Sequence, residues 1–281
     1  MGGIPMRFNF GLAARAFLIL AAFLLLAAPP AQVHAQAQDK IGVLLLHGKN
    51  PGSQNDPNLG RLKSKLSDEG MITLMPDMPW SARRYIDGDW DKAMAEIDAH
   101  VQSLRGKGAT KIVIAGHSMG CPAAMGYAAK YGKVDALVLL APGHVPYFYN
   151  TSPNLKVVRD SMDEARRMVA AGDSTTHHNF NDINQGRAQQ VRMTAPAFLS
   201  YFAAESDAEM SVTAPRIPAQ TAVIWVIGNE DPLLRAGRGY VFDKLPSNPK
   251  SQYLQVTANH LTTPVVARDA VAAWIKQAVA R

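Results

Sequence analysis

Cysteine and long apolar runs are scarce in this chain, and each shortage excludes a class of protein. Cys121 is the only cysteine among the 281 residues, so no disulfide can form within one chain. The basic residues are scattered without a dense stripe, although the formal net charge is +6, and such scattering is typical of a solvated surface. A disulfide-built scaffold is therefore excluded, and nucleic acid is not an expected partner.

The first apolar run, residues 16–28, is too short to cross a membrane. It has 13 residues, whereas a spanning helix needs about 20. Arg7 and Arg15 precede the run, and Pro29-Pro30 ends it. A basic segment followed by a short apolar run is typical of a secretory signal peptide rather than of a membrane anchor.

The small residues after this run predict where the signal peptide is removed. Val33-His34-Ala35 places small residues at the −3 and −1 positions of a cleavage site, and cleavage after Ala37 is the alternative. We therefore expect a signal peptide over residues 1–35 and an exported mature protein, periplasmic or secreted, with no stable membrane span. Cleavage removes two arginines and no acidic residue, which lowers the formal net charge from +6 to +4.

Strand-like and helix-like patterns alternate through the rest of the chain, residues 36–281. Strands are expected at 41–46, 71–75, 111–115, 136–140, 222–227 and 252–256. Helices are expected at 59–66, 91–104, 121–130 and 264–280. Because alternating strands and helices build a parallel sheet with both faces covered, we expect an α/β domain with a mostly parallel, doubly wound sheet.

The alternation stops between residues 144 and 218. Two segments there, 155–171 and 185–204, have helical patterns with no strand between them. Open α/β sheets bind ligands beyond the carboxyl ends of their strands, so a helical insertion at this point predicts a lid over a site. A long crossover with an extra helix is the alternative.

The most informative motif is Gly116-His117-Ser118-Met119-Gly120. It follows the buried strand 111–115 and opens the small-residue helix 121–130. Strand, sharp turn and helix form the setting in which G-x-S-x-G lifts a serine hydroxyl clear of the sheet, and the two glycines leave room where a Cβ would collide. The motif therefore predicts Ser118 as a nucleophile.

Serine needs a base, and the base needs an orienting acid. Asp231 follows the expected strand 222–227, and His260 follows the expected strand 252–256. Nucleophile, acid and base then occur in the chain order typical of this strand–turn–helix arrangement. Glu230 is the second candidate for the acid, and a turn or helix cap is the alternative role of Asp231 before a proline.

An oxyanion also needs donors. The backbone N–H of Met119 is one candidate, because it follows Ser118 at a helix N-terminus. The second is the N–H of Lys49, after the first strand, with Gly48 allowing close approach and His47 orienting the loop.

Leu46-His47-Gly48, the Ser118 motif, Gly228-Asn229-Glu230-Asp231-Pro232 and His260 together resemble the α/β-hydrolase superfamily. The resemblance spans residues 41–281. It implies the hydrolase fold, a Ser-His-Asp triad and a short-lived acyl-enzyme, and it leaves the substrate open.

Two other patterns resemble ligand sites only weakly. Asp87-Gly88-Asp89-Trp90-Asp91 has alternating acids but lacks the sixth-position glycine and distal glutamate of a calcium loop. His177-His178 has no convincing further ligands, so we expect neither a metal nor a cofactor. The aromatic segment 146–149 is expected either to line an acyl pocket or to pack as a hinge.

The sequence thus predicts an exported serine hydrolase, a carboxylesterase or lipase-like enzyme, that cleaves a small-molecule carboxylic ester or thioester. A peptidase or amidase with the same triad, and a binding protein of hydrolase fold without catalysis, are the alternatives.

Overall fold

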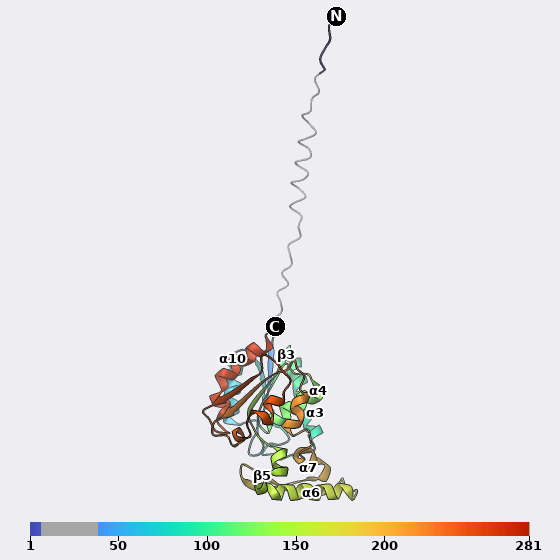
Figure 1. Ribbon diagram of the computed structural model, residues 1–281, viewed down its shortest axis with the longest axis vertical. Coiled ribbons are helices and arrows are strands. Elements are labelled where there is room, and N and C mark those ends of the chain that lie inside the picture. Colours follow the sequence, from blue (N-terminus) through green and yellow to red (C-terminus); the bar gives the residue numbers. More distant parts are fainter. Residues whose placement is uncertain (7–38, 281) are drawn as a thin grey trace. The chain divides into compact units, whose positions relative to one another are not determined.

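The computed structural model describes residues 1–6 and 39–280 (Figure 1). The apolar run 16–28 and both cleavage positions, Ala35 and Ala37, lie outside the described residues, so the signal peptide stays a prediction. Among the described residues, no helix combines the length and the apolar character that a membrane crossing requires.

Six strands form one parallel sheet in the order β2-β1-β3-β4-β7-β8. They are β1 (Ile41–Leu46), β2 (Ile72–Leu74), β3 (Lys111–Ser118), β4 (Ala136–Pro142), β7 (Ala222–Gly228) and β8 (Gln252–Val256). The winding direction reverses at β1, which pairs with β2 on one side and with β3 on the other. Because every pair is parallel, the carboxyl ends of all six strands meet at one edge, which is where open α/β sheets bind ligands.

Helices cover both faces of this sheet, as the sequence predicts (Figure 1). α2 (Pro57–Asp68) and α10 (Arg268–Val279) pack with the side chains of Val43 and Leu45. α3 (Trp90–Gly106) and α4 (Gly120–Tyr131) pack with Leu44 and Leu46. The alternation along β1 follows from the two-residue period of a strand, which sends successive side chains to opposite faces. The terminal helix expected over 264–280 is divided into α9 (Thr263–Val266) and α10.

An insertion, defined here as residues 144–218, separates β4 from β7. It contains α5 (Pro146–Thr151), α6 (Lys156–Ala170), β5 (His177–Asn184), β6 (Arg187–Thr194), α7 (Ala195–Phe202) and α8 (Met210–Thr213). The expected helix at 155–171 is present as α6. The helix expected over 185–204 is absent over its first half, because residues 187–194 form the second strand of an antiparallel hairpin with β5. The expectation that no strand lies between the two helical segments is also wrong, because β5 itself lies there.

The hairpin forms because of its turn and its buried apolar side chains, although its composition is mostly polar. The turn at Gln185 and Gly186 has φ of 50° and 77°, the positive values that a two-residue turn between twisted strands requires. Phe180, Val191 and Met193 are buried at alternating positions, whereas most of their neighbours are polar residues that strands usually disfavour. The Gln-Gly pair between two alternating segments was the available signal. Packing in the insertion outweighs the weak strand propensity, because the Phe180 ring stacks on the Phe198 ring of α7 with the ring centres 4.4 Å apart.

Candidate functional site

Ser118 lies at a strained turn between β3 and α4. Its φ is +53°, a left-handed conformation that non-glycine residues rarely adopt. A Cβ on Gly116 would come within 2.2 Å of the Gly120 carbonyl oxygen, and one on Gly120 within 2.1 Å of the Leu46 carbonyl oxygen. The turn therefore depends on glycine at both positions, as the sequence motif predicts, and it exposes the Ser118 side chain at the carboxyl edge of the sheet.

A chain of hydrogen bonds connects Ser118 to His260 and Asp231. The Ser118 Oγ lies 3.0 Å from His260 Nε2, and His260 Nδ1 lies 2.7 Å from Asp231 Oδ2. Because an ionised carboxylate only accepts, Nδ1–H donates to Asp231, and Nε2 is left to accept from the serine hydroxyl. This tautomer is the one a general base needs.

Asp231 serves two of the roles that the sequence left open. Its Oδ1 accepts from the N–H of Leu233 at 2.8 Å and caps a short 3-10 helix, Pro232–Ala236, while its Oδ2 contacts His260. The Asp231 side chain is 1% exposed, whereas Glu230 is exposed to solvent. Of the two candidate acids, the structure therefore brings Asp231 to the histidine.

His117 supports His260 from behind, a role that the sequence analysis missed. Its Nε2 lies 2.9 Å from the His260 carbonyl oxygen, so Nε2–H donates there. Burial, with the nearby His260 ring, lowers the pKa of His117 to about 4, and the ring is therefore neutral near pH 7. Its position inside the Ser118 motif was visible in the sequence, but its partner comes from the loop after β8.

The loop after β1 lies against the nucleophile candidate. A Cβ on Gly48 would come within 3.1 Å of the Ser118 Cβ, so glycine permits this approach. Met119 is buried at the start of α4, directly after Ser118. The residues proposed as oxyanion donors thus belong to two segments that adjoin Ser118: Met119 follows it in the turn, and Lys49 follows Gly48 in the loop.

His47 holds this loop in shape. Its Nε2 accepts from the N–H of Met78 at 3.0 Å, so its Nδ1 carries the proton and donates to the Gly48 carbonyl at 2.8 Å. The His47 carbonyl accepts from the Trp80 indole at 2.8 Å. Burial lowers the pKa of His47, which keeps the ring neutral. Both ring nitrogens of His47 are occupied by backbone groups, so the side chain orients the loop and is not available as a general base.

Gly143 is a second residue that sequence reasoning missed. A Cβ at this position would come within 2.7 Å of the Ser118 Oγ and within 3.3 Å of His260 Cε1. The glycine follows β4, whose end lies beside that of β3 in the sheet. Its small size therefore keeps open the space in which the serine hydroxyl meets the histidine.

Two pockets meet at Ser118 and His260. One, of about 550 Å³, has apolar walls from the insertion and the loops after β7 and β8, which include Phe148, Tyr149, Leu155, Ile183, Leu233 and Leu261. The other, of about 400 Å³, is bounded by the loop after β1 and the start of α2, with Ser53, Asn55 and Asn58 among its polar residues. Gln185, at the tip of the hairpin, lines both pockets. Of the aromatic segment 146–149, Phe148 and Tyr149 line the apolar pocket.

Cys121 is a packed residue behind the turn. It is fully buried, and its Sγ lies 3.1 Å from the Gly116 carbonyl oxygen and 3.4 Å from that of Leu140, so its one S–H has an acceptor in either direction. Burial raises the pKa of the Cys121 thiol, which opposes formation of a thiolate nucleophile.

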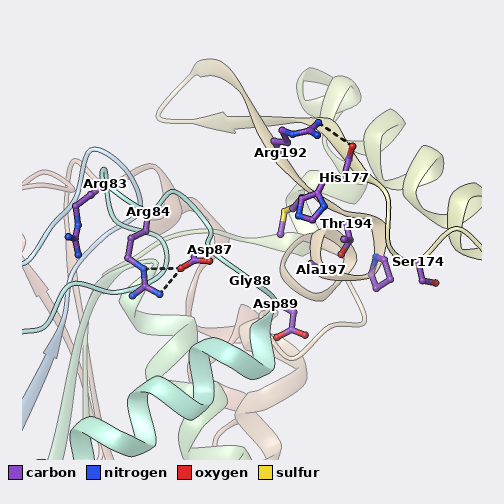
Figure 2. A pocket seen from close by; sticks show the side chains of 12 residues that line it. Arg83, Arg84, Asp87, Gly88, Asp89, Ser174, His177, Arg192, Thr194 and Ala197 are labelled. Carbon is purple, nitrogen blue, oxygen red and sulfur yellow. Dashed lines mark hydrogen bonds and ion pairs between the residues drawn. The ribbon is translucent and has the colours of Figure 1, made fainter.

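A larger polar pocket of about 770 Å³ lies between the hairpin and the segment before α3 (Figure 2). Arg84 pairs there with Asp87 and Glu96, and Arg192 donates to the His177 carbonyl. Asp89 caps α3 by accepting from the Lys92 N–H at 2.8 Å. The acids of the calcium-like run thus have protein partners, and none of the three candidate triad residues lines this pocket.

Over residues 1–6 and 39–280, no group of three or more His, Cys, Asp or Glu side chains is arranged to hold a metal ion.

Known proteins share this fold. The model of the alpha/beta hydrolase family matches residues 43–274. Among solved structures, Est1E from Butyrivibrio proteoclasticus is 18% identical, with a TM-score of 0.58 over 88% of this chain and 91% of that one. A monoacylglycerol lipase from Paleococcus ferrophilus is also 18% identical, with a TM-score of 0.59 over 84% of this chain and 94% of that one.

A structure reported for LipS and LipT, two metagenome-derived lipolytic enzymes, is 14% identical, with a TM-score of 0.57 over 85% of this chain and 94% of that one. No curated protein sequence matches the chain. At these identities the solved structures support the fold alone, while the family match covers most of the sequence. With a six-stranded parallel sheet wrapped by helices and a family match from residue 43 to residue 274, the chain belongs to the alpha/beta hydrolase family.

Proposed function

We propose that the protein is a serine hydrolase that cleaves carboxylic esters or thioesters with Ser118, His260 and Asp231 as its catalytic triad. The observation that carries this proposal is the pair of hydrogen bonds, 3.0 Å and 2.7 Å long, that joins the serine to the acid through the histidine. Membership of the hydrolase family supports a hydrolase, and the lipase and lipolytic enzymes among its structural neighbours make an ester the first substrate class to test.

The reaction begins with a proton transfer within the triad. His260 Nε2 takes the proton of the Ser118 hydroxyl as Oγ attacks the substrate carbonyl carbon, and Asp231 stabilises the imidazolium that forms. The N–H groups of Met119 and Lys49 stabilise the developing oxyanion, and loss of one such donor typically costs about 3–4 kcal/mol.

The acyl-enzyme then forms and is hydrolysed. His260 returns the proton to the leaving oxygen or sulfur as the bond to the acyl carbon breaks. A water molecule, deprotonated by His260, attacks the acyl carbon and releases the carboxylic acid, while Ser118 recovers its proton.

The two pockets suggest how a substrate would lie. We assign the apolar pocket of about 550 Å³ to the acyl chain and the pocket of about 400 Å³ to the leaving group. The walls of the first pocket favour burial of an apolar chain. The insertion supplies much of those walls, which is the role expected of a lid, and the Gln185 tip is the element that separates the two parts of the substrate.

We further propose export to the periplasm or the medium after removal of residues 1–35. Amino-terminal sequencing of the mature protein after cell fractionation tests this, and a mature chain that begins at Gln36 or at Gln38 agrees with the two predicted cleavage positions. An uncleaved chain in the cytoplasm contradicts it.

The catalytic proposal is tested with Ser118→Ala. We expect the wild-type protein to hydrolyse p-nitrophenyl esters and to be labelled by a fluorophosphonate probe at Ser118, and the variant to do neither while keeping its melting temperature. Hydrolysis at the wild-type rate by the variant refutes the assignment. A comparison of esters with aminoacyl amides then distinguishes an esterase from a peptidase, and absence of labelling in the wild type favours a binding protein.

A further inference from the structure

A buried ion pair joins the loop after β1 to the insertion. The ammonium of Lys49 donates to both carboxylate oxygens of Asp182 at 2.8 Å, and the two side chains are 2% and 0% exposed. Lys49 directly follows Gly48, which packs on Ser118, and Asp182 lies in β5 of the hairpin. The pair therefore connects the backbone beside the proposed nucleophile to a segment far along the chain.

The carboxylate of Asp182 has a complete set of partners. Besides Lys49, it accepts a hydrogen bond from the Tyr85 hydroxyl and one from Gln189 Nε2 at 3.2 Å. Burial by itself raises the pKa of Asp182, but the charge and hydrogen bonds of Lys49 and the Tyr85 hydroxyl outweigh it, so the pKa lies below its usual value. The carboxyl group is thus ionised near neutral pH, and the pair carries no net charge.

The ammonium has little freedom to move. Its Nζ lies 5.8 Å from the centre of the Tyr149 ring and 5.6 Å from that of the Phe202 ring, both within the range of cation–π attraction. Since these rings belong to α5 and α7, the lysine is surrounded by the insertion on several sides.

A second contact repeats the connection one residue further along. The side-chain amide of Asn184 donates to the Asn50 carbonyl oxygen. Asp182 and Asn184 are two residues apart on β5 and so face the same way, while Lys49 and Asn50 are consecutive in the loop. One face of β5 thereby holds two successive residues of the loop.

Stability alone is a weak explanation for this arrangement. Desolvation of two charges is costly, and a buried ion pair is often no better for stability than a well-packed apolar pair. An ion pair with fixed partners instead gives a defined position to the two segments that it joins, here the loop after β1 and β5. Here the defined backbone is the one whose N–H is proposed to face the oxyanion.

We propose that Asp182 is a positioning residue for the reaction, which holds Lys49 so that its backbone N–H is aimed at the oxyanion above Ser118. The inference rests on the proposed function and adds that the insertion takes part in transition-state stabilisation as well as in binding the substrate. Neither charge acts on the substrate directly, because each neutralises the other.

The test compares a charge-free double variant with the wild type. Lys49→Met/Asp182→Leu removes both charges together, so neither is left buried without its partner, and we expect the variant to fold. Its melting temperature should be lower than that of the wild type, because the Tyr85 hydroxyl and Gln189 Nε2 lose their acceptor. Without the ion pair the loop loses its position, and we expect kcat on a p-nitrophenyl ester to fall ten- to a hundredfold while KM changes less than threefold. Loss of a whole oxyanion donor typically lowers kcat by about 10²–10³, which is the upper limit of the effect.

Inhibition by an alkylboronic acid separates positioning from mere stability. The adduct with Ser118 places an oxygen where the oxyanion forms, so its affinity should fall at least tenfold in the double variant. Asp135→Asn is the matched control, because Asp135 pairs with Lys111 at 3.0 Å at the amino end of β3, the opposite edge of the sheet. We expect this control to lower the melting temperature without changing kcat or the affinity for the boronic acid.

Wild-type kcat and boronic-acid affinity in a folded double variant overturn the inference. If the double variant does not fold, Asp182→Asn replaces it, because the amide has the same shape and keeps an acceptor for the Tyr85 hydroxyl while it removes the ion pair. A several-fold loss of boronic-acid affinity then supports the inference, whereas unchanged affinity and kcat overturn it. Failure of the proposed function is distinct, since the wild type would then neither cleave the ester nor be labelled at Ser118.

Discussion

Gly143→Ala is expected to abolish most of the activity without unfolding the protein. The new Cβ would lie 2.7 Å from the Ser118 Oγ, too close for two non-bonded atoms, and 3.3 Å from His260 Cε1. The nearest backbone atom, the Ser118 Cα, would be 3.5 Å away, an ordinary contact. The φ of Gly143 is outside the left-handed region, so alanine adopts the same backbone. The groups that must yield are therefore the Ser118 hydroxyl, which turns about one bond, and the His260 ring, which must shift by a few tenths of an ångström.

The size of the loss follows from the hydrogen bond that this rotation breaks. The hydroxyl now lies 3.0 Å from His260 Nε2, and moving it away removes the general base from the nucleophile. General-base catalysis contributes about 10²–10⁴-fold, which corresponds to about 3–5 kcal/mol of transition-state stabilisation. We expect kcat/KM to fall by at least a hundredfold and the free energy of unfolding to change by less than about 1 kcal/mol, because no cavity forms and no backbone moves.

The assay pairs steady-state hydrolysis of a p-nitrophenyl ester with urea unfolding. Gly60→Ala in α2 is the matched control, because no atom lies within 4 Å of its added Cβ. This control should keep full activity and gain about 0.5–1 kcal/mol from the better helix propensity of alanine. Wild-type kcat/KM in Gly143→Ala, or a loss of stability as large as the loss of activity, would refute the reasoning.

Three further predictions concern the acid Asp231, the glycine turn and the buried His144. Asp231→Asn should keep its cap on Leu233 but hold His260 in the wrong tautomer, so kcat should fall by about 10⁴, and a loss below tenfold in ester hydrolysis would exclude Asp231 as the acid. Gly120→Ala forces its Cβ to within 2.1 Å of the Leu46 carbonyl, which cannot turn aside, so urea unfolding should show a loss of about 1–3 kcal/mol, and an unchanged midpoint contradicts the strain. Burial lowers the pKa of His144 to about 3, so between about pH 6.5 and pH 3 the unfolded chain binds a proton that the folded chain excludes. Stability is then full above this window and falls by up to about 1.4 kcal/mol per pH unit as the pH decreases within it; His144→Gln should show a shallower slope in unfolding at pH 4–7, and equal slopes would contradict the assignment.

The sequence was sufficient for the features that depend on local patterns. Continuous apolar runs predict the strands of the sheet and their order along the chain. The spacing in Gly116-His117-Ser118-Met119-Gly120 predicts a turn that requires glycine at both ends of the motif. Asp231 and His260 could be placed at strand ends for the same reason, since a parallel sheet brings the carboxyl ends together whatever lies between them.

The hairpin of the insertion could not be recognised in this way. Its strands are rich in polar residues, and the burial of Phe180 and Val191 depends on α6 and α7, which are formed by other parts of the chain. Propensity therefore favoured a helix across 185–204, and tertiary packing selected two strands.

What the sequence by itself determined is the strand–turn–helix at Ser118 and the chain order of its partners, because these arise from residues adjacent along the chain and from the period of each element. Only the tertiary structure decided that Lys49 meets Asp182, 133 residues away, that Gly143 makes room for the serine hydroxyl, and that His117 supports His260. Such contacts join segments whose local patterns carry no information about each other. The packing of the whole domain determines which segments lie side by side. A buried charge or hydrogen-bond donor then pairs with an acceptor on the neighbouring segment, because leaving it unpaired is costly.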